Sequence, residues 1–200
     1  MSRICASKPA SIQSRREQRR SLVKTFEHAL IVGGSGMLAG ACQSLCERAV
    51  RVSVLARNEK RIRTIAPSIE ALACDYNNRV GLTEVLSALE PPDLVVAWIH
   101  GRAPHARRAL AECVRAEGRF VQVLGSAHGD PSHPERLKEM EQAADGLPID
   151  HQSVVLGFVV ENGKSRWLNN AEISNGVLAA IDSAAPLHIV GTIEPWSAKP

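Results

Sequence analysis

Three glycines that follow a short apolar run are the residues of this chain best suited to binding chemistry. Residues 29–32 lead directly into Gly33, Gly34 and Gly36, and apolar residues at helical spacing begin at Met37. Such a turn lets the backbone approach a diphosphate, while the N-terminus of the following helix offers N–H groups and the positive end of its dipole. The motif therefore predicts a phosphate-binding turn made by Gly33, Gly34, Ser35, Gly36 and Met37. The alternative is an ordinary strand-to-helix turn.

Arg57 is the second candidate for phosphate binding, because it follows the next run of alternating apolar residues, 50–56. When a dinucleotide-binding fold takes NAD, the end of this strand carries an acidic residue that accepts hydrogen bonds from the ribose hydroxyls. Here the strand is expected to end at Ala56, and the guanidinium beside it suits a phosphate. This pair predicts NADP(H) in preference to NAD(H). The alternative for Arg57 is an exposed charge at the start of a helix.

Histidines follow two later apolar runs: His100 comes after residues 93–99, and His128 comes after residues 119–124. Because imidazole titrates in the range useful for acid–base chemistry, both are candidate proton donors at the reactive end of a cofactor. Their alternative role is that of surface or supporting residues. Trp98 either walls the same pocket or fills the core. A metal site is not predicted, because the spacing of the four histidines in these two loops is unspecific.

The elements that must position these residues alternate in type along the chain. Runs typical of strands occur at 29–32, 50–56, 69–74, 93–99, 119–124, 153–160 and 187–192, and segments with helical spacing separate them. The alternation predicts an α/β fold, a single-domain doubly wound parallel sheet of the Rossmann type with right-handed crossovers. Ligands of such sheets bind beyond the carboxyl ends of the strands, where the strand order reverses.

Polar residues predict where several of the helices begin. Asn58, Asn169 and either Asn77 or Asn78 are expected N-caps, because a short side-chain oxygen can accept a hydrogen bond from the first helical turn. The segment 132–135, Ser-His-Pro-Glu, has the spacing of a capping box and predicts the start of a charged helix that ends near Gly146.

Taken in order, these motifs resemble the short-chain dehydrogenase/reductase family over residues 28–195. The glycine turn is similar to the form found in extended and atypical members. The resemblance implies that Arg57 and Asn58 meet the adenosine 2′-phosphate, that Asp75 accepts a hydrogen bond from the adenine amino group, and that Tyr76 lies beside the base. By the same resemblance, further cofactor contacts fall on Ala97, Trp98 and Ile99 at the end of the fourth strand and on Gly157, the glycine that interrupts the sixth. For Asp75, the alternative is a turn or cap residue.

The chain departs from this family at the catalytic residues. The resemblance places the active-site serine at Ser126, although Ser126 could equally be no more than the end of a strand. The family's Tyr-x-x-x-Lys should follow about a dozen residues later, but that stretch contains no tyrosine, and the chain's only tyrosine is Tyr76. Carbonyl reduction by the family's usual mechanism is therefore not implied. Ser126, His100 and His128 remain as the candidate catalytic residues.

Charge and cysteine usage narrow the class of protein. Of the net charge of +3, residues 1–26 contribute seven basic groups and one acid, so the remainder is mildly acidic and a nucleic-acid partner is not expected. We expect this tail to be disordered and the domain to span 27–200. The five scattered cysteines are typical of reduced thiols in a cytoplasmic protein, and no apolar run is long enough to cross a membrane.

The sequence thus predicts an NADP(H)-dependent oxidoreductase that transfers hydride to a small soluble molecule, and it leaves assembly as a homo-oligomer open. The rival prediction is a non-catalytic NADP(H) sensor, since intact cofactor motifs beside an altered catalytic half favour either one. A third reading, nucleic-acid binding through the basic tail, predicts steeply salt-dependent binding that is lost with the tail. The loops that would select the substrate carry no diagnostic chemistry.

Overall fold

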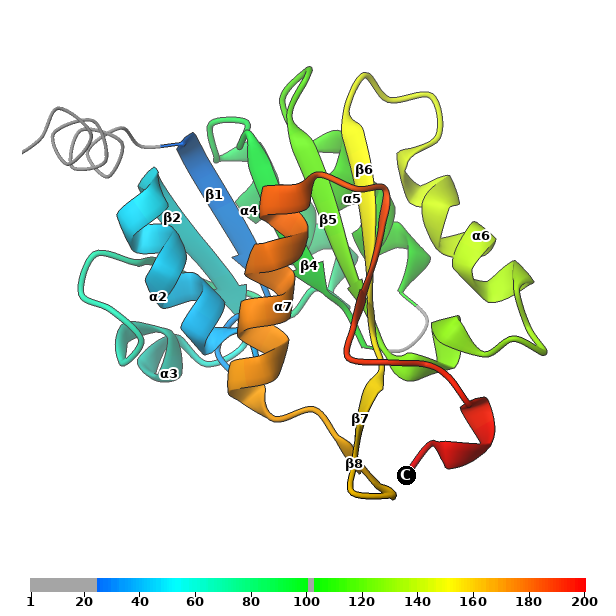
Figure 1. Cartoon of the computed structure of the whole chain (residues 1–200). Coiled ribbons are helices and arrows are strands. Elements are labelled where there is room, and N and C mark those ends of the chain that lie inside the picture. Colours follow the sequence, from blue (N-terminus) through cyan, green and yellow to red (C-terminus); the bar gives the residue numbers. More distant parts are fainter. Residues whose placement is uncertain (1–24, 101–102) are drawn as a thin grey trace, which may run out of the picture.

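The computed structural model describes residues 25–100 and 103–200 of the chain. One seven-stranded parallel sheet forms its centre (Figure 1), with the order β3-β2-β1-β4-β5-β6-β9. Its strands are β1 (Phe26–Val32), β2 (Ala49–Ala56), β3 (Glu70–Ala73), β4 (Leu94–Trp98), β5 (Arg119–Leu124), β6 (Asp150–Leu156) and β9 (Leu187–Val190). This order, which reverses between β1 and β4, confirms the predicted Rossmann-type α/β fold.

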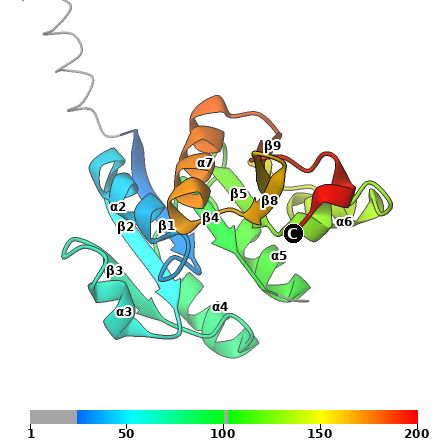
Figure 2. The same cartoon turned by 60° about the horizontal axis from the view of Figure 1, so that its bottom comes forward.

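Helices cover both faces of the sheet (Figures 1 and 2). One face carries α2 (Ala39–Arg48), α3 (Glu59–Arg63) and α7 (Asn170–Ser183), and the other carries α4 (Arg79–Ser87), α5 (Pro104–Glu112) and α6 (Glu135–Glu141). The described residues also form three short 3₁₀ turns, η1 (Ser126–Gly129), η2 (Gln142–Ala144) and η3 (Trp196–Ala198). Among the described residues, no helix has the length and hydropathy needed to cross a bilayer.

Strand β1 illustrates why its apolar run is continuous. Ala29 and Ile31 pack into the core under α2 and α7, whereas Leu30 and Val32 pack into the core under α4 and α5. All four are fully buried, as a central parallel strand covered by helices on both faces requires. The sheet thus separates two hydrophobic clusters, and successive residues of β1 pack into opposite ones.

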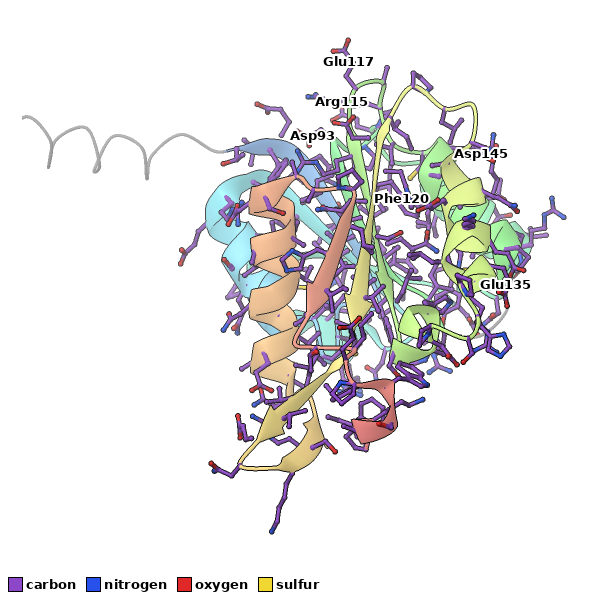
Figure 3. The ribbon with its side chains drawn as sticks, turned by 45° about the vertical axis from the view of Figure 1, so that its right-hand side comes forward. Asp93, Arg115, Glu117, Phe120, Glu135 and Asp145 are labelled. Atoms are coloured by element: carbon purple, nitrogen blue, oxygen red, sulfur yellow. The ribbon has the colours of Figure 1, made fainter. Side chains whose placement is uncertain are left out.

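Asp93 ties the start of β1 to the start of β4. Its carboxylate accepts hydrogen bonds from the backbone N–H groups of Glu27 at 3.0 Å and His28 at 2.7 Å, and Arg115 lies 3.6 Å from it (Figure 3). These contacts lie at the amino-terminal edge of the sheet, so they set strand register at the end away from the expected ligand. Strand β1 already includes Phe26, one residue before the expected start of the domain. Residues 1–24 of that expected tail lie outside the described part of the chain.

The predicted sixth strand is wrong in its second half. Strand β6 ends at Leu156, and the chain continues as an antiparallel hairpin of β7 (Phe158–Glu161) and β8 (Lys164–Trp167). Gly157 lies at the break, where its backbone approaches Thr192 so closely that a Cβ atom would lie 2.1 Å from the Thr192 carbonyl oxygen. The glycine interruption in the sequence therefore marks a crossing of two chain segments.

The crossover through α7 also differs from the prediction. The step from β6 to β9 runs along the sheet in the same direction as the step from β4 to β5, yet α7 packs beside α2 on the face opposite α5 (Figure 1). This connection has the opposite hand to the one through α5, and the expectation of uniformly right-handed crossovers is wrong here. The β7–β8 hairpin lies between the end of β6 and the start of α7 in the chain.

The asparagine caps are confirmed, and the capping box at 132–135 is wrong. Asn58, Asn78 and Asn169 each accept a hydrogen bond from the first turn of their helix. Helix α6 begins only at Glu135 and ends at Glu141, short of Gly146. The Asp130 carboxylate accepts the Ser132 N–H at 2.9 Å, and this local turn competes with helix formation there.

Candidate functional site

A first cavity of about 970 Å³ lies beyond the carboxyl ends of β1 to β4, where the strand order reverses. Figure 2 views the molecule with this end turned forward. The residues that line it come from the loops after these strands: Gly33, Ser35, Gly36, Met37, Leu55, Ala56, Arg57, Asn58, Arg61, Cys74, Asp75, Tyr76, Asn77, Trp98 and His100. This is the position at which doubly wound sheets bind their ligands.

The glycine turn forms one wall of this cavity, and the surroundings of its three glycines differ. Gly33 has a φ of 78°, and a Cβ atom there would lie 2.7 Å from the carbonyl oxygen of Trp98. Gly34 faces the interior, where a Cβ atom would lie 2.7 Å from Cys42 Sγ. At Gly36 a Cβ atom would meet no atom within 4 Å, so this glycine borders open space. The backbone at Gly36 is thus the part of the turn that a ligand can approach.

Helix α2 follows the turn and directs its N-terminus at the cavity. The first turn of α2 contains no acidic residue, so its positive dipole end is not offset there. Ser174 of α7 donates a hydrogen bond of 2.9 Å to the carbonyl oxygen of Met37, and Gly40 allows the two helices to approach closely. The turn is therefore braced from behind by α7. The buried Cys42 is a core residue, and burial raises the pKa of its thiol to about 12.

Two arginines reach the cavity from the end of β2. Arg57 follows the last residue of β2, and Arg61 lies on the first turn of α3. Asn58, placed between them, accepts the Arg61 backbone N–H at 3.1 Å and so acts as the helix cap. Sequence analysis missed Arg61, although it lies only four residues beyond Arg57, in the first turn of the helix that Asn58 caps. The two guanidinium groups bring positive charge to this side of the cavity.

The loop after β3 forms the opposite wall. Asp75 Oδ1 accepts hydrogen bonds from the backbone N–H of Asn77 at 3.0 Å and from its side chain at 2.9 Å. The hydrogen bond from the Asn77 backbone is the main reason that the pKa of Asp75 is lowered. The alternative that Asp75 is a turn residue is thus supported by its contacts, while its side chain still lines the cavity. Tyr76 also lines the cavity, and its hydroxyl accepts a hydrogen bond from the backbone N–H of His100 at 2.9 Å.

Trp98 and His100 lie between this cavity and a second one, because both residues line both cavities. The Trp98 indole N–H donates to His100 Nε2 at 2.7 Å, and the rings meet edge to face at a centroid distance of 4.8 Å. An indole nitrogen can only donate, so His100 Nε2 carries no proton and the imidazole proton is on Nδ1. In this arrangement the remaining hydrogen-bonding position of the imidazole is Nδ1.

The second cavity, of about 510 Å³, lies beyond β4 and β5 and is closed on one side by α6. Its lining residues are Trp98, Ile99, His100, Arg107, Val123, Leu124, Gly125, His128, Glu135, Arg136, Glu139 and Met140. His128 Nδ1 lies 3.1 Å from the Gly125 carbonyl oxygen. Burial, followed by the positive charges of Arg107 and Arg136, lowers the pKa of His128. The cavity therefore combines an apolar floor with polar walls.

Four predicted site residues line neither cavity: Gly34, Ala97, Ser126 and Gly157. Gly34 packs against Cys42, and Ala97 is fully buried within β4 between β1 and β5. Ser126 begins η1, beside the second cavity. Gly157 lies at the strand crossing. The other predicted residues line one cavity or both. No group of three metal-ligating side chains occurs within residues 25–100 and 103–200.

A buried amide links the second cavity to the core. The groups around Gln122 on β5 fix its orientation, since the Arg107 guanidinium only donates and the Met140 carbonyl only accepts. Its oxygen then accepts from Arg107 Nε at 3.2 Å, and its nitrogen donates to the Met140 carbonyl oxygen at 3.0 Å and to His151 Nε2 at 3.2 Å. His151 is thus an acceptor at Nε2, which favours its neutral form.

The free energy of unfolding is expected to decrease as the pH falls below about 6.5. Burial lowers the pKa of His151, and also the pKa values of His28 and His128, so the unfolded chain takes up these protons at a higher pH than the folded protein does. Urea unfolding between pH 7.5 and pH 5.5 measures the effect. His151→Gln, which keeps a polar group but does not titrate, should reduce the dependence, and an identical dependence in this variant would contradict the assignment.

Solved structures share this fold, whereas no protein-family profile and no curated protein matches the chain. A short-chain dehydrogenase from Burkholderia cenocepacia in complex with NADP has a TM-score of 0.69 at 17% identity, covering 86% of this chain and 91% of that one. The bulky-bulky ketone specific alcohol dehydrogenase from Comamonas testosteroni has a TM-score of 0.61 at 16% identity, covering 87% and 90%. At these identities the similarity establishes the fold.

A third similar structure holds a different coenzyme. It is described as a D-mannonate oxidoreductase from Haemophilus influenza with bound NAD, and it has a TM-score of 0.63 at 10% identity, covering 89% of this chain and 97% of that one. The similar structures thus include complexes with NADP and one with NAD. The fold defines this protein as a Rossmann-type α/β protein that is similar in structure to short-chain dehydrogenases.

Proposed function

We propose that this protein binds NADP(H) and transfers hydride between it and a small soluble molecule. The observation that carries the proposal is that Arg57 and Arg61 line the same cavity as the glycine turn. Guanidinium groups at the end of β2 suit a phosphate on the adenosine ribose, and β2 ends at Ala56, where an NAD-binding protein places a carboxylate. The diphosphate and the ribose phosphate of the coenzyme would therefore have partners in one cavity, the glycine turn and the two arginines.

The remaining lining residues support an orientation for the coenzyme. The backbone at Ser35 and Gly36 and the N-terminus of α2 would hold the diphosphate, since they combine N–H groups with the positive dipole end. Tyr76 and Asp75 would lie beside the adenine. Trp98 and His100 would face the nicotinamide, because they alone among the described residues line both cavities. The second cavity would then receive the molecule that exchanges hydride.

Bound NADPH supplies the hydride, and this chain must orient the reactants and provide hydrogen-bond donors. His100, neutral and protonated on Nδ1, has one N–H available to polarise an acceptor oxygen. It is the first candidate for this role, and Ser126 and His128 beside the second cavity are the others. Because Nε2 of His100 accepts from Trp98, the proposed role is that of a hydrogen-bond donor that does not need to be charged.

Arg57→Ala is expected to weaken NADPH binding by about tenfold and to leave NADH binding unchanged. Only NADPH carries the second phosphate, and a charge-assisted hydrogen bond contributes about 1.5–3 kcal/mol. Dissociation constants for both coenzymes, measured by calorimetry on the wild type and on each variant, test this. Arg63→Ala is the matched control, because Arg63 lies nearby on α3 but pairs with Glu59 and does not line the cavity. Equal affinity of the wild type for NADH and NADPH would overturn the coenzyme assignment.

A non-catalytic NADP(H) sensor is the second candidate function. The observation in its favour is that Tyr76, the chain's single tyrosine, lines the first cavity and hydrogen-bonds to the backbone of His100. The hydroxyl of Tyr76 is therefore not on the α6 side of the second cavity, where the resemblance would place the family's catalytic tyrosine. NADPH consumption with carbonyls, quinones and flavins separates the two functions. Turnover that is lost in His100→Ala or Ser126→Ala supports the enzyme, whereas tight binding without turnover supports the sensor.

A further inference from the structure

We propose that His28, Ser53 and Glu70 form a buried proton-binding site that makes a hydrogen bond between β1 and β2 depend on pH. The three side chains lie on adjacent strands, β1, β2 and β3, and none of them lines either cavity. This site is therefore separate from the proposed coenzyme site. The number of protons that the contacts between the three side chains require points to it.

A chain of close contacts links the three side chains. Nε2 of His28 lies 2.8 Å from Oγ of Ser53, and that oxygen lies 2.5 Å from Oε2 of Glu70. On the other side of the imidazole ring, Nδ1 of His28 lies 3.2 Å from the carbonyl oxygen of Glu90. His28 is only 5% exposed and Ser53 is fully buried. Bulk water therefore cannot replace a hydrogen bond that is missing between these two residues.

The protons of this chain can be counted from the donors and acceptors. A carbonyl oxygen only accepts, so Nδ1 of His28 carries a proton. The single hydroxyl proton of Ser53 can go to His28 or to Glu70, but not to both. Both contacts of Ser53 are hydrogen bonds only when one further proton is present, either on Nε2 of His28 or on the carboxyl group of Glu70. Neutral His28 beside ionised Glu70 leaves one contact without a proton.

Arg51 decides which group holds the further proton. It donates to both carboxylate oxygens of Glu70, from Nε to Oε2 and from Nη2 to Oε1, each at 3.0 Å. Burial alone would raise the pKa of Glu70, but the hydrogen bonds from Ser53 and Arg51 outweigh burial and lower it. Glu70 is therefore the ionised member of the chain, and the further proton belongs on Nε2 of His28.

The surroundings of His28 set the pH at which this proton is taken up. The charged groups nearby come from β1, β2, β3 and the segments beside β4: Glu27, Arg51, Glu70, Glu90, Asp93 and Arg115. Burial lowers the pKa of His28 and Arg51 adds to this, whereas the Glu90 carbonyl, Glu70 and Asp93 act in the opposite direction. The net effect places the pKa below its ordinary value of about 6.5, so uptake occurs at mildly acidic pH.

The contact between β1 and β2 then changes with pH. Above this range, Ser53 donates to Glu70, and no proton lies between Ser53 and His28. Below it, Nε2 of His28 donates to Ser53, and a charge-assisted chain of hydrogen bonds joins the strands. Protonation has the opposite effect at His151, because its Nε2 accepts from Gln122 and would lose that hydrogen bond. The hydrogen bond gained at His28 offsets part of the cost of burying the charge.

The test is an NMR titration of the imidazole nitrogens of the full chain between pH 7.5 and pH 4.5. We expect His28 to carry a proton on Nδ1 alone at pH 7.5 and on both nitrogens at the acidic end. Ser53→Ala keeps every charge but removes the acceptor for Nε2–H, so it should lower the proton affinity of His28 by about tenfold. Ser153→Ala is the matched control, because Ser153 is also a buried strand serine and its hydroxyl has no hydrogen-bond partner within the described chain.

Several results would overturn the proposal. An Nε2–H tautomer of His28 at pH 7.5 would contradict the proton count, and His28 that stays neutral until the protein unfolds would exclude proton uptake. An unchanged titration of His28 in Ser53→Ala would mean that the charges alone set its proton affinity. An equal decrease in Ser153→Ala would mean that the effect comes from looser packing. The two wild-type results stand even if Ser53→Ala fails to fold.

Discussion

Gly36→Asp is expected to weaken NADPH binding by about 100-fold while leaving the protein as stable as the wild type. A Cβ atom at this position meets no atom within 4 Å, so we expect the fold to accept the substitution. A carboxylate just before α2 also interacts favourably with the helix dipole. The same carboxylate would face the coenzyme diphosphate, and like charges about 4 Å apart repel by about 4 kcal/mol at an effective dielectric constant of about 20. That exceeds the roughly 2.7 kcal/mol that corresponds to 100-fold in affinity.

Calorimetric titration and thermal unfolding of the same samples measure the two quantities. Gly36→Asn is the matched control, because it adds nearly the same volume without the charge, and its affinity should lie between those of the wild type and Gly36→Asp. Unchanged NADPH affinity in Gly36→Asp would mean that the diphosphate does not bind at this turn. A large loss of stability would mean that the space beside Gly36 is not open.

Gly157→Ala is expected to show the reverse pattern, with a loss of about 2–3 kcal/mol of folding free energy and normal NADPH affinity in the molecules that remain folded. The added Cβ atom would lie 2.1 Å from the carbonyl oxygen of Thr192. Neither segment can move away easily, because Phe158 and Thr192 exchange two backbone hydrogen bonds of 2.9 and 2.8 Å. Gly157 lines neither cavity, so the coenzyme should not sense the substitution directly.

Urea unfolding measures the stability change, and coenzyme titration at low temperature measures the affinity. Gly125→Ala is the control for the glycine-to-alanine change, because its Cβ atom would lie 3.7 Å from Trp98, an ordinary contact. A stable Gly157→Ala protein that fails to bind NADPH would restore the role that the family resemblance gave this glycine.

Local sequence patterns were sufficient to predict several parts of the site. The glycine turn was recognised because an apolar strand, a glycine cluster and a helical pattern follow one another within about fifteen residues. The asparagine caps at 58 and 169 were recognised for a similar reason, since a cap contacts only the next turn of the chain. The prediction of a capping box at 132–135 was wrong, because Asp130 and Pro134 favour a tight turn in the same few residues.

Side-chain direction was less accessible from the sequence. Ala97, Trp98 and Ile99 are consecutive, yet Ala97 is buried in the sheet, Trp98 lines both cavities and Ile99 lines only the second. Alternation along a strand predicts that neighbours face opposite sides, but not which side holds a ligand. Arg107 was missed as a site residue because its position on a helix face says nothing of a cavity formed by β5, α5 and α6.

The sequence by itself determined the alternation of strands and helices, the turn at 33–36 and the basic residue after β2, because each depends on residues that are close along the chain. The tertiary structure decided which face of the sheet α7 covers and that Arg107 and His128 share one cavity. These features depend on contacts between segments far apart in the sequence, whose relative placement follows from the packing of two cores against one sheet.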